Sequence, residues 1–184
     1  MVDIQTVLTY LTLISVPVGV AYHIMTLNNT RKNQQMQLET RKAQLISRLR
    51  EMFWEIETGL IGMELLEMKW TDYEDFAKKY DSTVNPENYA KRFKIWGQLQ
   101  EIGYLIHEGI IDVESVYDLL GGYNSLIIWE KFKPVIYQQR IVYNDPSWFK
   151  WFEYLAEEIK KHRQELGISS DIGDPDGYLA LSNR

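Results

Sequence analysis

The N-terminal stretch of the chain has no charged side chain between Asp3 and Arg31, and this feature constrains the fold more than any other. Its core, Ile4–Leu27, would span roughly 36 Å as an α-helix with a rise of ~1.5 Å per residue, which is enough to cross a hydrocarbon layer of about 30 Å. Pro17 and Gly19 would weaken a helix in water, but they are tolerated in lipid, where a kink is the usual result. The stretch therefore predicts one transmembrane helix.

Three other structures for this segment fit less well. A cleaved signal peptide needs a basic N-terminal region, and the residues MVDIQ carry no positive side chain. A buried core helix would be shorter and interrupted by charges, and an amphipathic helix lying on a membrane would be more polar on one side. We therefore expect a single-pass membrane protein.

Basic residues follow the apolar segment at once, with only Glu39 of opposite charge among them up to Arg50. Because short flanks rich in Lys and Arg stay in the cytoplasm, we expect the N-terminus outside the cell membrane and the main domain inside. Basic side chains beside anionic headgroups gain about 1 kcal/mol each, so membrane lipids are expected partners; a topology signal with solvated charges is the alternative. The residues expected at the membrane surface are Arg31, Lys32, Arg41 and Lys42.

Small and polar residues form a stripe along one face of the predicted transmembrane helix, because they recur at spacings of three and four. Such residues allow close approach and hydrogen bonding between helices, which predicts self-association or a partner membrane protein. The alternative is that the hydroxyls bond to carbonyls of their own helix and face lipid. The predicted partner face consists of Thr12, Ser15, Gly19 and His23.

The rest of the chain predicts an all-α domain, and no run of residues has the alternation of a strand. We expect an N-terminal transmembrane helix (residues 1–30) that continues into a cytoplasmic multi-helix bundle (31–167), followed by a flexible tail (168–184). Pro134 should break or kink its helix. Periodicity and end signals place helices at about 31–67, 72–80, 85–107, 112–120, 123–142 and 145–167. The first contains an apolar seam expected in the core: Ile46, Leu49, Phe53, Ile56, Leu60 and Met63.

Aromatic residues are abundant, with 6 Trp, 12 Tyr and 6 Phe. At helical spacing such side chains are usually core residues rather than the lining of a ligand pocket. Trp148 and Trp151 lie so close together that one of them is expected at the surface, where it could meet a partner or the membrane interface.

Several segments resemble those of an uncharacterised family of small prokaryotic proteins that is assigned only to a domain of unknown function. They are NNTRKNQQMQLETRKAQL after the anchor, then EIGYLIHEGIIDVESVYDLLGG, WEKFKPVIYQQR and WFEYLAEEIKKHR. The resemblance covers most of residues 1–163. It implies an N-terminal anchor and a helical domain, and it supplies no activity or catalytic residue.

The sequence contains no recognisable catalytic signature. The absence of cysteine excludes disulfides, zinc–thiolate sites and thiol nucleophiles, and no phosphate-binding loop, dinucleotide fingerprint, zincin motif or nucleophile elbow is present. Glu158 and His162, four residues apart, are expected to form an exposed ion pair rather than a metal site. An EF-hand loop containing residues 174–177 is excluded, because Ile172 and Asn183 would occupy its first and last ligand positions.

We therefore expect no cofactor, metal or catalytic residue, and a net charge of −6 argues against binding to nucleic acid. The leading hypothesis is a membrane-tethered helical interaction or scaffold module, such as an accessory subunit or a homo-oligomer. The alternative is a membrane-attached enzyme or ligand sensor with a site between helices. A deep polar pocket would favour the alternative.

Overall fold

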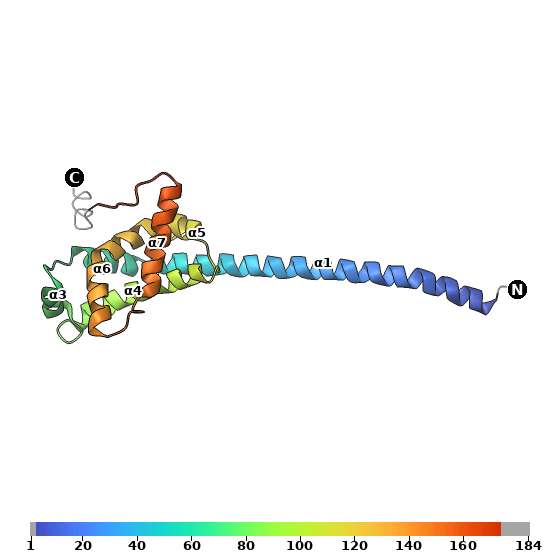
Figure 1. Ribbon diagram of the computed structural model, residues 1–184, viewed down its shortest axis with the longest axis horizontal. Helices are drawn as coiled ribbons and strands as arrows, with labels where there is room; N and C mark the ends of the chain where they lie inside the picture. The colour runs from blue at the N-terminus through green and yellow to red at the C-terminus, as the bar shows by residue number, and fades with distance from the viewer. Residues whose placement is uncertain (1–2, 174–184) are drawn as a thin grey trace. The chain divides into compact units, whose positions relative to one another are not determined.

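The computed structural model describes residues 3–173, and all regular structure in that range is α-helical, as predicted. The contacts divide the chain into two units, Met1–Leu45 and Ile46–Arg184. The helices, labelled in Figure 1, are α1 (Ile4–Phe53), α2 (Ile56–Glu67), α3 (Tyr73–Tyr80), α4 (Pro86–His107), α5 (Val113–Leu119), α6 (Gly122–Val142) and α7 (Lys150–Glu165).

Within the first unit the chain forms a single element, because α1 continues from the apolar segment through the basic residues without a break. Pro17 lies inside this helix. The apolar segment is long enough to cross a membrane, and its side chains are not buried. Among residues 3–173 this is the one helix with the length and composition of a membrane span.

The predicted helix over residues 31–67 is interrupted at Trp54 and Glu55, where α1 ends and α2 begins. Glu55 adopts an extended conformation, with φ −61° and ψ 133°. The indole Nε1 of Trp54 donates a hydrogen bond to the carbonyl oxygen of Leu119, 3.0 Å away. A contact with a residue so distant in sequence, rather than a local Pro or Gly, thus accompanies the break.

The break changes which face of α2 is buried, and half of the predicted seam is therefore wrong. Leu49 is buried as expected, whereas the seam residues that follow the break face outward. The residues of α2 that enter the core instead are Thr58, Ile61, Leu65 and Leu66.

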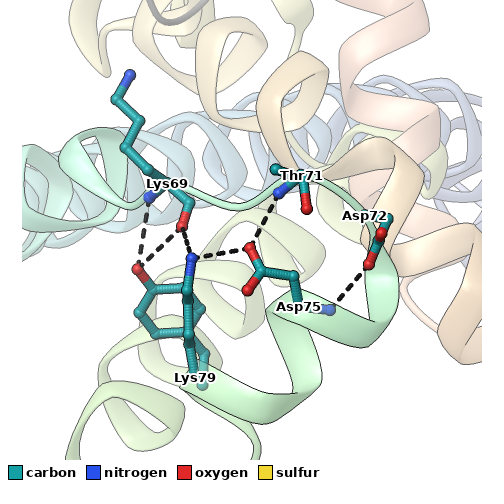
Figure 2. A network of polar contacts seen from close by, with 6 residues as sticks. Lys69, Thr71, Asp72, Asp75 and Lys79 are labelled. Atoms are coloured by element: carbon teal, nitrogen blue, oxygen red, sulfur yellow. Dashed lines mark hydrogen bonds and ion pairs between the residues drawn. The ribbon is translucent and has the colours of Figure 1, made fainter.

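A local network of polar contacts fixes the start of α3 (Figure 2). The carboxylate of Asp72 accepts the backbone N–H of Asp75 at 2.9 Å, and the carboxylate of Asp75 in turn accepts the N–H of Thr71 at 3.1 Å. Lys79 joins the network through an ion pair of 2.8 Å with Asp75 and a bond of 3.3 Å to the carbonyl of Lys69. The predicted helix over 72–80 is thus confirmed, with reciprocal capping by the two aspartates.

The core of the domain lies where α7 packs against α4 and α6 (Figure 1). At Gly103 of α4 a side chain is excluded, since a Cβ there would overlap the carbonyl oxygen of Trp151. Gln100, one turn earlier, accepts hydrogen bonds of 2.9 Å from the backbone N–H groups of Trp151 and Phe152. Helix α7 has no side-chain cap at Phe149, so Gln100 satisfies N–H groups that its first turn leaves free.

Helix α7 begins at Lys150 rather than at Asp145, where the sequence predicted its start. Asp145 does cap a turn, since its carboxylate accepts the N–H of Ser147 at 2.9 Å. The turn does not continue as a helix because Phe149 has a left-handed conformation, φ 51°, which non-glycine residues rarely adopt. The buried ring of Phe149 packs on Trp96, with centroids 5.4 Å apart, which holds this conformation in place.

Two further predictions concern helix continuity and helix ends. Pro134 was expected to break or kink its helix; α6 continues through this residue, so a break is excluded, and the kink stays a prediction. Gly109 and Gly167 both have positive φ angles after α4 and α7, the conformation that favours glycine at a helix C-terminus. Of the predicted tail, residues 168–173 are described and lie outside the helices, whereas 174–184 lie outside the described residues.

Candidate functional site

A groove of about 350 Å³ opens on the domain between the start of α2, α4 and the start of α6. Its floor includes the buried side chains of Leu99 and Leu66, and the exposed Trp54 stands at its rim. The groove is lined by Phe53, Trp54, Thr58, Gly59, Gly62, Met63, Leu66, Ile95, Leu99, Leu120, Gly121, Asn124, Ser125 and Ile128.

None of the described residues that line the groove is charged. The polar residues that line it include Thr58, which is only 5% exposed and has a buried hydroxyl. This hydroxyl makes no hydrogen bond with any described atom. A helical Thr usually bonds to the carbonyl four residues earlier, but that residue here is Trp54, in the break before α2.

Two glycines of α2, Gly59 and Gly62, widen the groove. No described atom outside their own helix lies within 4 Å of the place that a Cβ would take at either position. Close packing inside the domain therefore does not require glycine at these two positions, in contrast to Gly103 on α4.

Next to the groove, α2 presents an apolar face to solvent. The exposed fractions are 67% for Trp54, 81% for Ile56, 57% for Leu60 and 49% for Met63. The last three recur at spacings of four and three, so they lie on one side of the helix. A stripe of this kind differs from single exposed apolar residues, which are common on any protein surface.

Acidic side chains flank this face, and α2 carries no basic residue. Glu57 and Glu64 reach ion-pair partners on α4, Lys94 at 3.4 Å and Lys91 at 2.8 Å. Glu67 adds a third carboxylate at the other end of the helix. Two of these three carboxylates are thus paired with lysines of α4, so the rim of the apolar face is acidic but partly neutralised.

A second polar cluster joins α6 to α7. Arg140 contacts the carboxylate of Glu153 at 2.7 Å, and the hydroxyl of Tyr137 donates to the other oxygen at 2.5 Å. Burial and this bond raise the pKa of Tyr137 to about 12. Burial alone would raise the pKa of Glu153, but the bond from Tyr137 and the contact with Arg140 outweigh it, so its pKa lies below the ordinary value. These contacts join two helices, which is a structural role.

Arg92 is a buried cation held mainly by aromatic rings. Its guanidinium lies 4.7 Å from the ring centre of Phe76 and 5.4 Å from that of Trp96, distances typical of cation–π contacts. It also donates to Asn88 at 2.9 Å and to the carbonyl of Tyr80. Burial lowers the pKa of Arg92 to about 10, so the side chain remains charged at neutral pH.

The residues predicted at the membrane surface all lie on α1 with exposed side chains. On the predicted partner face, Thr12 and Ser15 donate to carbonyl oxygens of their own helix, those of Leu8 at 2.9 Å and Thr12 at 3.2 Å. Around Gly19 no described atom of another element lies within 4 Å of the place that a Cβ would take, and His23 is exposed. The role of the basic residues at the membrane surface and the role of the polar stripe in binding a partner helix both stay predictions. The four membrane-surface residues are Arg31, Lys32, Arg41 and Lys42.

Other residues discussed in the sequence analysis have structural partners. Trp148 and Trp151 are both partly buried, and the most exposed Trp of this helical domain is instead Trp54. Glu158 pairs with Lys161 at 2.6 Å rather than with His162. Among residues 3–173, no group of three or more potential metal-binding side chains is present.

The groove itself was missed by sequence reasoning, which predicted one continuous helix over residues 31–67. An exposed apolar face on α2 could have been suspected from composition, because IETGLIGMELLE is too apolar all round to hide one face only.

Comparison with known proteins identifies a family, but no curated relative and no similar solved structure. No curated protein and no solved structure gave a significant match. The model of the family described as domain of unknown function DUF4760 matches residues 4–159. This match includes the apolar segment and nearly all of the helical domain, up to Ile159 of α7. The chain therefore belongs to the DUF4760 family.

Proposed function

We propose that this protein is a membrane-tethered interaction module, anchored by Ile4–Leu27 and binding a partner protein through the exposed apolar face of α2. The observation that carries the proposal is the face formed by Ile56, Leu60 and Met63, on a helix whose opposite side is in the core. Contiguous apolar surface with a polar rim is typical of protein interaction sites.

The charges around this face define the chemistry of the partner. Glu67, together with the partly neutralised Glu57 and Glu64, would disfavour an anionic lipid surface, and two copies of α2 placed face to face would bring these carboxylates together. A helix that presents apolar side chains flanked by Lys or Arg would satisfy both the apolar face and its acidic rim. We therefore assign the α2 face to a helix of that composition on another protein.

In the same proposal the basic segment sets the orientation. The apolar segment would cross the cell membrane with Asp3 outside, and Arg31, Lys32, Arg41 and Lys42 would meet anionic headgroups on the cytoplasmic side. Since the chain has no cysteine, Asp3→Cys and Glu108→Cys each create a single reactive thiol. An impermeant maleimide added to intact cells should label only the first variant; labelling of the second would reverse the topology.

The interaction is tested with full-length protein extracted in mild detergent, with particle mass and composition measured. We expect an assembly containing a second protein, and we expect Leu60→Glu to release that protein. The matched control is Ile141→Glu, which places the same charge at another highly exposed apolar position, 72% exposed on α6. The control should leave the assembly intact.

Cross-linking then identifies the contact itself. A photoreactive maleimide on Leu60→Cys should cross-link to a basic, apolar helix of the released protein. A monomeric particle, or an assembly that survives Leu60→Glu, would overturn the proposal. A product of twice the chain's own mass would replace the separate partner with a second copy of this chain.

A further inference from the structure

We propose that the groove beside α2 binds an uncharged, mainly apolar small molecule that forms a hydrogen bond with the hydroxyl of Thr58. This inference goes beyond the interaction role, because it concerns a ligand bound by the protein alone. The groove adjoins the exposed face of α2 and shares Trp54 and Met63 with it.

The dimensions and lining of the groove are those of a small-molecule site. Its volume of about 350 Å³ falls within the range of roughly 300–1,000 Å³ that is usual for ligand pockets. Such pockets are lined mainly by apolar side chains with a few polar groups that fix orientation. Here Ile95, Leu99 and Ile128 supply the apolar surface, and Thr58, Asn124 and Ser125 supply the polar groups.

The hydroxyl of Thr58 is the polar group that we expect a ligand to bind. It is buried and has no hydrogen-bond partner among the described residues, and Thr58 is one of the residues that line the groove. Leaving such a group unpaired destabilises the folded protein, because the hydroxyl loses its hydrogen bonds to water and gains none in return. The indoles of Trp96 and Trp129 also lack partners, but neither lines the groove. Thr58 therefore combines a buried, unpaired hydroxyl with a place in the wall of the groove.

The two glycines of α2 leave room for such a molecule. Glycine inside a helix is less stable than alanine, and no contact with a described residue requires glycine at position 59 or 62. Occupation of the groove by a ligand explains why side chains are missing there.

The charge pattern limits the class of ligand. No charged residue lines the groove among those described, so an ion would enter without a counter-charge, which is strongly unfavourable in an apolar site. The ligand is therefore a neutral molecule with an apolar body and one hydroxyl, arylamine or carbonyl group placed to reach Thr58.

The test uses full-length protein in phosphatidylcholine nanodiscs and N-phenyl-1-naphthylamine, a neutral fluorescent probe with one N–H group. Empty nanodiscs give the signal of probe dissolved in lipid. We expect an additional saturable signal with one site per chain. Thr58→Val keeps the shape but removes the hydroxyl, and it should weaken binding about 2- to 10-fold, as expected for one hydrogen bond.

Filling the groove provides the decisive variant. Gly62→Leu should abolish the saturable signal, and Gly59→Leu is the replacement if Gly62→Leu fails to fold. Gly97→Leu on α4 is the matched control, because Gly97 also has open space around it but does not line the groove. Wild-type protein that adds nothing to the lipid signal, or a filled variant that binds like wild type, would overturn the proposal. Neither result depends on any partner protein, so the interaction role is tested separately.

Discussion

Helices α7 and α2 both pack against α4, but the two contacts are built differently. At the α7 contact, Gly103 is required because the backbone of Trp151 occupies the space where a side chain would be. At the α2 contact, Gly59 and Gly62 face open space. The same residue type therefore serves close packing on one side of the domain and an open groove on the other.

The difference separates the structural part of the domain from the part available for binding. Along α7 the buried groups are matched: Gln100 caps the helix, and Phe152, Leu155 and Ile159 are fully buried. Along α2 one hydroxyl is unpaired and one apolar face is exposed. An element with an exposed apolar face and an unpaired polar group is the one expected to bind a partner or a ligand.

The largest effect should come from Gly103→Ala. Its methyl group would overlap the carbonyl of Trp151 and crowd Leu155, and backbone overlap cannot be relieved by changing a rotamer. We expect a loss of about 3 kcal/mol or more in the free energy of unfolding, at the upper end for overpacking, despite the better helix propensity of alanine. Chemical denaturation of the full-length protein measures this. An unchanged midpoint would remove the distinction between the two contacts.

The next effect concerns the cap on α7. Gln100→Leu leaves two backbone N–H groups without their acceptor, so we expect a loss of about 1–3 kcal/mol. Gln98→Leu is the matched control on the same helix, since the side-chain oxygen of Gln98 is buried without a partner. The control should be neutral or stabilising. Equal losses in both variants would show that Gln100 acts by packing rather than by capping.

A smaller effect should appear at acid pH. Because the folded state lowers the pKa of Glu153 below its ordinary value of 4.5, the carboxylate contributes stability above that pH and loses it as the pH falls further. Glu153→Gln should therefore be less stable than wild type at pH 7, and the difference should shrink below about pH 4.5. Thermal unfolding between pH 3 and 7 tests this, and a constant difference would contradict it.

Local signals predicted much of this fold. Asn85–Pro86 and Asp112 marked the starts of α4 and α5, and their side chains do accept the expected N–H bonds. These features depend on residues within one helix or at its ends, so a single sequence reveals them.

Features that depend on distant residues were not predicted. The break after Phe53 coincides with the bond from Trp54 to Leu119, and Phe149 is held in its left-handed conformation by rings from α4. A pattern of spacings assumes a continuous helix, so once the break rotates α2 the seam it predicts is wrong. The groove was missed for the same reason, because it depends on which face of α2 turns inward.

The smallest expected effect tests most directly whether the groove beside α2 is occupied. Gly62→Ala and Gly97→Ala both add a methyl group in open space on a helix, so helix propensity alone predicts the same gain of about 0.5–1 kcal/mol for each. Gly62 lines the groove and Gly97 does not.

If lipid or detergent occupies the groove of the purified protein, the methyl group at position 62 displaces part of that lipid or detergent, and the gain in stability there should be smaller. Thermal unfolding of both variants in the same detergent measures the difference. Equal gains would mean that the groove is unoccupied under those conditions, and a loss at Gly97 would show that propensity does not govern these helices.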